Sequence, residues 1–446
     1  MRTPVCDFVR DYAASRPVRM HMPGHKGNPR LGPEPLDITE IAGADELYRA
    51  RGILRESEEN AARLFGAART LYSTEGSSQC VRAMTALALG HARDRGIPAR
   101  LLAGRNAHQS LLSAAALLDA EIDWLYPEPE EGLLACTVTP EGLEQALSGK
   151  AYAAVYLTAP DYLGHLPDLR PLADVCHAHD TLLLVDNAHG AYLKFLPESR
   201  HPIDRGADLC CDSAHKTLAC LTGAAYLHIA EGAPVILREQ ASAALQLFGS
   251  TSPSWLILQS LDRMNAELAG SFPGKLAETC RRLADFKAAL AAAGWPLEGQ
   301  EPLKLTLRPK AYGYTGLQLA EKLRVHGIEP EFADPDFVTL MPSPDTPAAD
   351  WFRLGCAFRS IAPRDPLSGA LPPVPRLPRV RGIREAMLGP REEVPIDRAE
   401  GRVLADTSLS CPPAVPVAVP GERLNAEAAA CFRYYGISSC FVLQEK

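Results

Sequence analysis

The sequence lacks an excess of positive charge, a long apolar run and any Cys-x-x-Cys pair, and each absence argues against a class of function. With 46 Lys and Arg against 54 Asp and Glu, the formal net charge is −8, which is unfavourable for binding nucleic acid or anionic membranes. No stretch approaches the length of a membrane span, and residues 1–7 lack an apolar signal core. We therefore expect a cytoplasmic protein without nucleic-acid or membrane partners.

Cysteine is present but scattered, with 12 residues that include the adjacent pair Cys210-Cys211. Without Cys-x-x-Cys spacing, zinc and dithiol redox roles have little support, so we expect reduced, mostly buried thiols and no metal. The chain of 446 residues is 46% hydrophobic and 22% charged and contains no internal repeat. These values indicate an ordinary soluble protein with two or three domains.

Short apolar runs alternate with helix-length segments through the first half of the chain. This alternation is typical of an α/β domain with a largely parallel sheet, to which the last run could add an antiparallel edge strand. The runs lie at residues 100–103, 153–157, 181–185, 207–211 and 224–229.

Composition and periodicity divide the rest of the chain. Residues 1–38 contain six prolines and little periodicity, which predicts an extended arm. Helical spacing continues at 255–268 and 276–293, and a smaller α+β unit follows. Prolines interrupt 363–378, predicting a connector, and 411–422, predicting extended chain that fixes the location of Glu422. The domains predicted are an arm (1–38), a large domain (39–255), a helical connection (256–300) and a C-terminal α+β domain (301–446).

Polar residues follow four of the apolar runs. In open α/β sheets ligands bind beyond the carboxyl ends of the strands, so these clusters predict a single site. They are His108, the run Pro160-Asp161-Tyr162, Asp186 with His189, and Ser213 to Lys216.

Asp186 and Lys216 together suit pyridoxal phosphate. The lysine amine forms a Schiff base with the cofactor's aldehyde, and the carboxylate keeps the pyridine nitrogen protonated so that the ring withdraws electrons. Gly76, Ser77 and Ser78 precede or begin a predicted helix, whose N–H groups and hydroxyls can hold the phosphate. The alternatives are a solvated loop lysine for Lys216 and plain helix capping for the others.

With these segments identified, the chain resembles the Orn/Lys/Arg decarboxylases of the aspartate-aminotransferase-like fold, in a short form without an N-terminal receiver-like domain. The resemblance implies an α/β pyridoxal-phosphate fold, in which a mostly parallel large domain is followed by a smaller α+β C-terminal domain. The matching runs are MPGHKG (22–27), DITEI (37–41), GSS (76–78), RNAHQS (105–110), DNAHGAY (186–192), SAHKTL (213–218), TSPSW (251–255) and the C-terminal REEVP and VPGE.

The resemblance also implies roles for single residues. Lys216 matches the Schiff-base lysine, Asp186 the partner of the pyridine nitrogen, and His108 the histidine that stacks on the ring. Ser213 and His215 are placed against the phosphate and the catalytic centre, and His189 over the ring edge. For His108 and His189 the alternative is a purely structural role.

A second subunit is implied at two places. Ser250 and Thr251 precede the run that reaches the partner's phosphate in the family, although the same loop could simply cap the next helix. His25 and Lys26 on the arm would lie near a shared active site, which favours at least a homodimer.

Glu422 is the candidate for binding the far end of a basic substrate, because a carboxylate can pair with a guanidinium or ammonium group.

The resemblance implies decarboxylation of a basic amino acid, arginine first and then lysine or ornithine, to the corresponding amine. The alternatives are another reaction of the same cofactor, such as transamination or elimination, and a catalytically silent protein that binds cofactor or polyamine. The departures from the family's usual runs concern substrate recognition rather than the cofactor. They are Asn187, Tyr192, Glu75, Gln109 and the run Cys411-Pro412-Pro413-Ala414.

Overall fold

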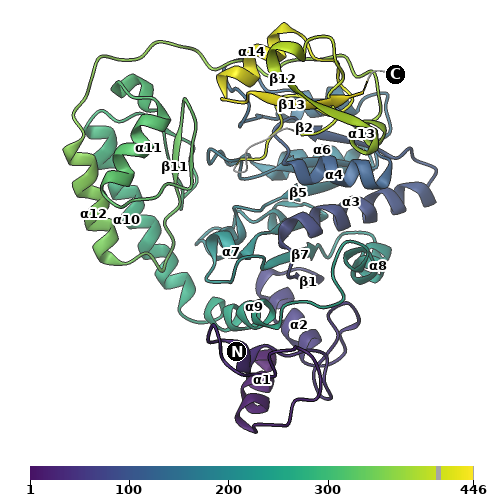
Figure 1. The fold of residues 1–446 in the computed structure, drawn as a ribbon. Coiled ribbons are helices and arrows are strands. Elements are labelled where there is room, and N and C mark those ends of the chain that lie inside the picture. The colour runs from purple at the N-terminus through teal and green to yellow at the C-terminus, as the bar shows by residue number, and fades with distance from the viewer. Residues whose placement is uncertain (408–412, 445–446) are drawn as a thin grey trace. The chain divides into compact units, whose positions relative to one another are not determined.

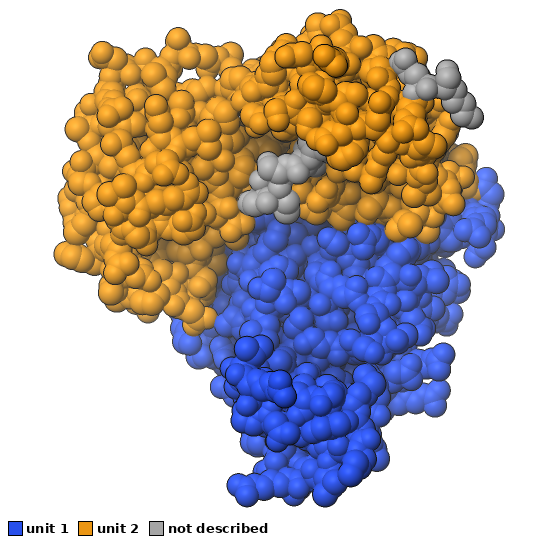
Figure 2. Space-filling view, viewed as in Figure 1, with its two compact units in different colours: residues 1–96, 169–277 blue, residues 97–168, 278–446 orange. Residues whose placement is uncertain are grey.

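The computed structural model describes residues 1–407 and 413–444 and divides the chain into two compact units (Figure 2). Unit 1 comprises residues 1–96 and 169–277, and unit 2 comprises residues 97–168 and 278–446. Within the described part of the chain, none of the helices combines the length and the apolar character needed to cross a bilayer.

The predicted, mostly parallel sheet is confirmed, and among the described residues it has seven strands (Figure 1). Unit 1 contributes strands in the order β1-β7-β6-β5, and unit 2 contributes β4-β2-β3. Neighbours β5–β6, β2–β3 and β2–β4 are parallel. The strands are β1 (Arg69–Ser73), β2 (Arg100–Gly104), β3 (Glu121–Leu125), β4 (Ala154–Thr158), β5 (Leu182–Asp186), β6 (Leu209–Asp212) and β7 (Ala225–Ile229).

The last predicted strand differs in its position. β7 is antiparallel to its neighbours, as expected, but it pairs with β6 on one side and β1 on the other, so the prediction of an edge strand is wrong. The reason is β1, whose register aligns Arg69 with Ile229 and Ser73 with Ala225. Four of the five β1 residues are buried, and β7 is the strand that pairs with them.

Unit 1 holds the helices that surround these strands. α3 packs against β6 and β7, and α2 packs against β1 and α9. The helices are α1 (Pro4–Ala14), α2 (Ile53–Phe65), α3 (Gly76–Asp94), α6 (Leu169–Ala178), α7 (Ala214–Thr217), α8 (Val235–Gln246) and α9 (Trp255–Leu268), with 3-10 helices at Glu34–Leu36, Leu47–Arg49, Ala191–Phe195 and Pro202–Arg205.

The arm is not extended at its start, so that prediction is wrong for α1. Proline at the first helical turn is compatible with a helix because its missing N–H would have no intrahelical partner. The free N–H groups of Val5 and Cys6 donate to the Asp262 carboxylate of α9 at 3.0 and 2.9 Å. Val5 and Val9 are fully buried. A distant side chain therefore supplies the cap that the local sequence does not show.

Unit 2 confirms the α+β character of the C-terminal part. Its small antiparallel sheet runs β10-β11-β9-β8, and β12 pairs with β13. Residues 363–378 contain no helix or strand, as predicted. The strands are β8 (Leu297–Glu298), β9 (Leu305–Leu307), β10 (Phe332–Ala333), β11 (Val338–Leu340), β12 (Arg391–Pro395) and β13 (Ser439–Leu443). The helices are α4 (Gln109–Leu118), α5 (Pro140–Leu147), α10 (Phe272–Ala292, beginning in unit 1), α11 (Gly316–Val325), α12 (Ala348–Ser360), α13 (Ile383–Leu388) and α14 (Ala426–Tyr434), with 3-10 helices at Pro309–Tyr312 and Ile396–Arg398.

The chain before Glu422 is non-helical from Pro413 onward, as its prolines predict, and Glu422 forms an antiparallel bridge with Arg379. Cys411 and Pro412, which belong to the same predicted segment, lie outside the described residues.

Candidate active site

Two neighbouring strand ends of unit 1 carry the predicted acid and lysine. β5 is buried along its whole length and ends at Asp186, which lies beside Cys211 of the parallel strand β6. Asp186 is 3% exposed, and one carboxylate oxygen accepts the N–H of Ala188 at 3.1 Å. The short helix α7 follows β6 directly and contains Lys216. The parallel pairing therefore places both segments at the same edge of the sheet.

Lys216 and His189 are in direct contact. The Lys216 Nζ lies 3.0 Å from His189 Nε2. His189 belongs to the turn after β5 and is 5% exposed, whereas Lys216 is half-buried. The turn that begins with Asp186 thus also brings a histidine nitrogen to 3.0 Å from the amine, while the role of His189 in the site stays a prediction.

The start of α3 forms a polar cradle in the same unit. Gly76 is the first helical residue and has a φ of +71°, which favours glycine. Ser77 and Ser78 follow it in the first turn, and Ser213 donates its hydroxyl hydrogen to the Ser77 hydroxyl at 2.8 Å. A helix N-terminus with converging hydroxyls suits a phosphate dianion. With Lys216 and Asp186 at adjacent strand ends, the residues present fit pyridoxal phosphate.

Ser250 and Thr251 lie in the exposed loop between α8 and α9. The Ser250 N–H donates to the carboxylate of Glu75, the residue directly before the α3 cradle. The loop therefore contacts the cradle of its own chain through Glu75, one of the departures from the family's usual run. Whether the loop also reaches a partner's phosphate stays a prediction.

His25 and Lys26 make contacts within the arm. His25 Nε2 lies 3.2 Å from a carboxylate oxygen of Asp37, and its Nδ1 accepts the N–H of Gly27 at 2.9 Å. Lys26 donates from Nζ to the His21 carbonyl at 2.6 Å. Their predicted place near a shared active site stays a prediction.

His108 and His215 both have one ring nitrogen committed to local structure. His108, in unit 2, is the N-cap of α4, and its Nδ1 accepts the Ser110 N–H at 3.1 Å. His215, in unit 1, has its Nδ1 2.9 Å from the Ala224 carbonyl, to which it can donate. In each case the contact holds the orientation of the ring.

Glu422 is buried in unit 2 rather than exposed on a loop. Its carboxylate accepts the Val419 N–H at 2.7 Å and is 4% exposed. Burial raises the pKa of Glu422, while the positive charge of Arg105 opposes that rise. Arg105 donates to the carbonyls of Pro416 and Val417 at 2.7 and 2.9 Å. Arg105 was missed as an individual residue, although it opens the RNAHQS run.

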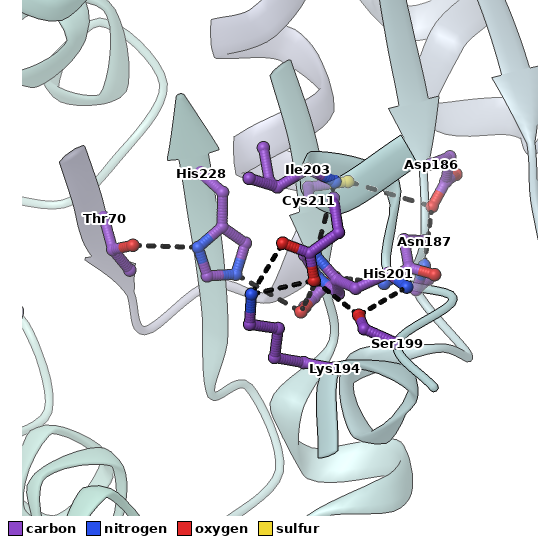
Figure 3. A network of polar contacts seen from close by, with 12 residues as sticks. Thr70, Asp186, Asn187, Lys194, Ser199, His201, Ile203, Cys211 and His228 are labelled. Atoms are coloured by element: carbon purple, nitrogen blue, oxygen red, sulfur yellow. Dashed lines mark hydrogen bonds and ion pairs between the residues drawn. The ribbon is translucent and has the colours of Figure 1, made fainter. Parts of the chain in front are cut away.

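The sequence also did not predict a buried polar network beside the ends of β5 and β6 (Figure 3). Asp212 accepts hydrogen bonds from Asn187, His201 and His228, and Asp212, His201 and His228 are fully buried. The only signal in the sequence is that Asn187 lies within the DNAHGAY run and that Asp212 directly precedes the SAHKTL run.

Comparison with known proteins agrees with this geometry. Residues 3–306 match the family model for the Orn/Lys/Arg decarboxylase major domain, and residues 373–442 match that for the Orn/Lys/Arg decarboxylase C-terminal domain. An arginine decarboxylase of Halalkalibacterium halodurans is 28% identical, in an alignment covering 97% of this chain and 93% of that protein. An arginine decarboxylase of Bacillus subtilis is also 28% identical, covering 95% and 92%.

Solved structures show the same fold at lower sequence identity. The lysine decarboxylase of Francisella novicida superposes with a TM-score of 0.80 at 16% identity, covering 99% of this chain and 81% of that one. The constitutive lysine decarboxylase of Escherichia coli gives a TM-score of 0.79 at 19% identity, covering 99% and 82%. Both of these chains are longer than the region that they share with this protein.

Proposed function

Because the chain belongs to the Orn/Lys/Arg decarboxylase family, it is a pyridoxal-phosphate-dependent decarboxylase of a basic amino acid, and we propose that this amino acid is arginine. The observation that carries the choice of arginine is the near end-to-end similarity to two arginine decarboxylases. The product would be the amine that keeps the guanidinium group. Lysine and ornithine are the next candidates.

The proposed roles in unit 1 follow from the groups at the strand ends. When bound, the cofactor supplies an electron sink for the pair left at Cα as carbon dioxide departs. Asp186 would pair with the pyridine nitrogen of the bound cofactor, and Lys216 would provide the amine that holds the cofactor and can carry a proton at Nζ. His189, 3.0 Å away, orients that amine and can exchange its proton.

The phosphate and the ring have their own proposed contacts. The first turn of α3 and its hydroxyls hold the phosphate, with Ser213 bonded to Ser77 as an additional hydroxyl. As the resemblance implies, His108 would stack on the cofactor ring, and the hydrogen bond from the Ser110 N–H holds the orientation of the imidazole. His215, whose Nδ1 lies 2.9 Å from the Ala224 carbonyl, would be a second proton carrier.

Substrate recognition and assembly complete the proposal. Glu422 would pair with the guanidinium of arginine, because a carboxylate can accept two parallel hydrogen bonds from that group. Ser250, Thr251, His25 and Lys26 serve a site shared between two subunits of a cytoplasmic homodimer. The four predicted domains remain our proposal for the organisation of the chain: residues 1–38, 39–255, 256–300 and 301–446.

The test is carbon dioxide release by purified, cofactor-loaded protein offered arginine, lysine, ornithine and several neutral amino acids in turn. We expect release from arginine at the highest kcat/KM and the amine as product, both lost in Lys216→Ala. Higher kcat/KM with lysine or ornithine would overturn the choice of arginine. A keto acid in place of the amine would overturn decarboxylation itself.

A further inference from the structure

The end of β5, which carries Asp186, and the end of β6, which precedes Lys216, are joined through the buried carboxylate of Asp212. Its partners Asn187, His201 and His228 are labelled in Figure 3. Asp212 ends β6, four residues before Lys216, and Asn187 directly follows Asp186. The Asn187 side-chain amide donates to one oxygen of Asp212 at 2.6 Å. The Asn187 backbone N–H also donates to the Cys211 carbonyl at 3.0 Å. The side chain and the backbone of Asn187 therefore both bond to the end of β6.

Two histidines complete the surroundings of the carboxylate. His201 and His228 point their Nε2 atoms at the second oxygen of Asp212, at 3.0 and 3.2 Å. Their Nδ1 atoms are satisfied elsewhere, because His201 Nδ1 accepts the Ile203 N–H at 3.4 Å and His228 Nδ1 lies 2.8 Å from the Thr70 hydroxyl. These partners assign the Nε2–H tautomer to both rings.

The contacts make Asp212 an anion with three N–H donors. Burial alone would raise the pKa of Asp212, but the two imidazoles outweigh it and hold that pKa well below its usual range. Burial lowers the pKa of His228, which keeps that ring neutral. His201, Asp212 and the Cys210 thiol lie close enough to hold a cation, yet the His201 and Asp212 atoms already bond each other, and burial raises the pKa of Cys210. The cluster is therefore a hydrogen-bonded support and not a metal site.

The charge of Asp212 explains why residue 187 is an asparagine. A carboxylate at residue 187 would place two oxygens about as close as the present 2.6 Å contact, where both cannot ionise without water. An amide supplies the donor and no charge. The turn is also tight, since a Cβ on Gly190 would meet the Asn187 side-chain oxygen at 2.0 Å. Any change at Asn187 is therefore passed to this turn, which also carries His189.

We propose that Asp212 and Asn187 are a positioning pair for the decarboxylase reaction. Neither residue acts on the substrate. Together they fix the separation between Asp186 and Lys216 and hold the turn that brings His189 to 3.0 Å from the lysine amine. The inference rests on the proposed roles of Asp186 and Lys216, and it adds two residues for which the resemblance supplied no role.

The test compares Asn187→Asp, Asp212→Asn and the exchange that combines both. In Asn187→Asp one carboxyl must take up a proton or turn away, so we expect kcat to fall at least about tenfold while KM changes less than about threefold. The pH midpoint of the bound cofactor's visible absorbance should shift, because it reports the proton at the Lys216 nitrogen. The exchange restores one carboxylate facing one amide and should recover part of kcat and of the midpoint.

A matched control is Asn265→Asp on α9, which also puts a charge into the buried interior of unit 1. The Asn265 amide donates to the Tyr72 hydroxyl at 2.7 Å and touches neither strand end. We expect Asn265→Asp to lower thermal stability about as much as Asn187→Asp does, but to leave the pH midpoint of the cofactor absorbance unchanged. If Asn187→Asp does not fold, Asn187→Ser, which shortens the donor without adding charge, should show the same separation of kcat from KM on a smaller scale.

Two outcomes would overturn the positioning role. One is an Asn187 variant with the kcat and absorbance midpoint of the unaltered protein, and the other is an exchange variant no better than the worse single variant. The absorbance titration needs no turnover. If the unaltered protein released no carbon dioxide from any amino acid, the proposed function would fail while the titration still tested the pair.

Discussion

At the scale of single residues, the contact between His189 and Lys216 gives the sharpest expectation. His189→Leu removes the ring nitrogen that lies 3.0 Å from the amine, so we expect kcat to fall by about a hundredfold as proton transfer loses its partner. His189→Gln keeps a polar side chain at that place and should lose less. Steady-state kinetics with the preferred amino acid measures both variants.

The matched control is His177→Leu, a histidine of α6 in the same unit that is 47% exposed and pairs with Asp208. It should keep full turnover. Equal kcat values for His189→Leu and the unaltered protein would show that His189 is a structural residue of the turn.

In unit 1, the candidate residues with the clearest signal in the sequence are those that follow an apolar run. Asp186 and Lys216 could be found because an apolar run locates each strand and the polar residues follow it. His201 could not be found, because it contacts Asp212 from a short 3-10 segment with no periodic pattern. Arg105 was hidden for a similar reason, since its partners Pro416 and Val417 lie more than 300 residues away.

At the scale of secondary-structure elements, His165 joins the segment after β4 to β8 within unit 2. Its two ring nitrogens lie 2.7 Å from Asp161 and 2.9 Å from Glu298. Hydrogen bonds to these two carboxylates raise the pKa of His165 to about 10. The histidine is therefore charged at neutral pH and bridges two anions that would otherwise repel each other.

We expect His165→Asn to lower the free energy of unfolding at pH 7 by on the order of 1–2 kcal/mol, a value reduced for the partial exposure of the ring. Because the folded-state pKa is raised, the stabilisation is complete below about pH 6.5 and is lost as the pH rises through 10. Thermal midpoints from pH 6 to 10.5 measure the difference. The control is His326→Asn, which changes an exposed histidine whose Nε2 lies 3.0 Å from the Ser360 hydroxyl, and it should show no such trend.

Asp334 gives the opposite pH dependence in the turn between β10 and β11. One oxygen accepts the N–H groups of Asp336 and Phe337, both at 2.7 Å, and burial raises the pKa of Asp334 to about 7. Stability should therefore fall as the pH rises from about 4 to 7. Asp334→Asn keeps the acceptor without the charge, so we expect a higher thermal midpoint than the unaltered protein at pH 8 and a smaller difference at pH 5.

The exposed Asp345 supplies the comparison for that experiment, because Asp345→Asn removes a charge that is in contact with water. It should leave the midpoint unchanged at both pH values. A fall in the midpoint of Asp334→Asn at pH 8 would mean that the carboxylate contributes net stability in its charged form.

Elements were predictable where their signal is local. α9 begins at Trp255 and ends at Leu268, as its helical spacing predicts, and Thr315 caps α11 with a capping box. α1 was missed because its cap, Asp262, comes from another helix. β1 was missed because its five residues follow α2 closely, and without β1 the neighbouring strand β7 looks like an edge.

At the scale of the whole molecule, the alternation of strands and helices was sufficient to predict an α/β fold with a smaller α+β part. The division of the chain into units could not be predicted in the same way. Unit 1 and unit 2 are each built from two separate stretches of sequence, and boundaries in sequence order cannot represent such an arrangement. The composition also does not determine whether two subunits share an active site. An experiment on mixed subunits can test this.

The proposed shared site predicts complementation between two impaired variants. If Thr251 of one subunit completes the phosphate site of its partner, a mixed dimer of Lys216→Ala and Thr251→Arg contains one site with both residues intact. Random mixing should then recover up to about a quarter of the full activity, since half of the dimers are mixed and each has one working site. Mixing Lys216→Ala with Asp186→Ala is the matched control, because both residues belong to the same chain's site and no intact site can form. Two affinity tags establish that mixed dimers are present, and mixed dimers without recovered activity would show that each subunit builds its site alone.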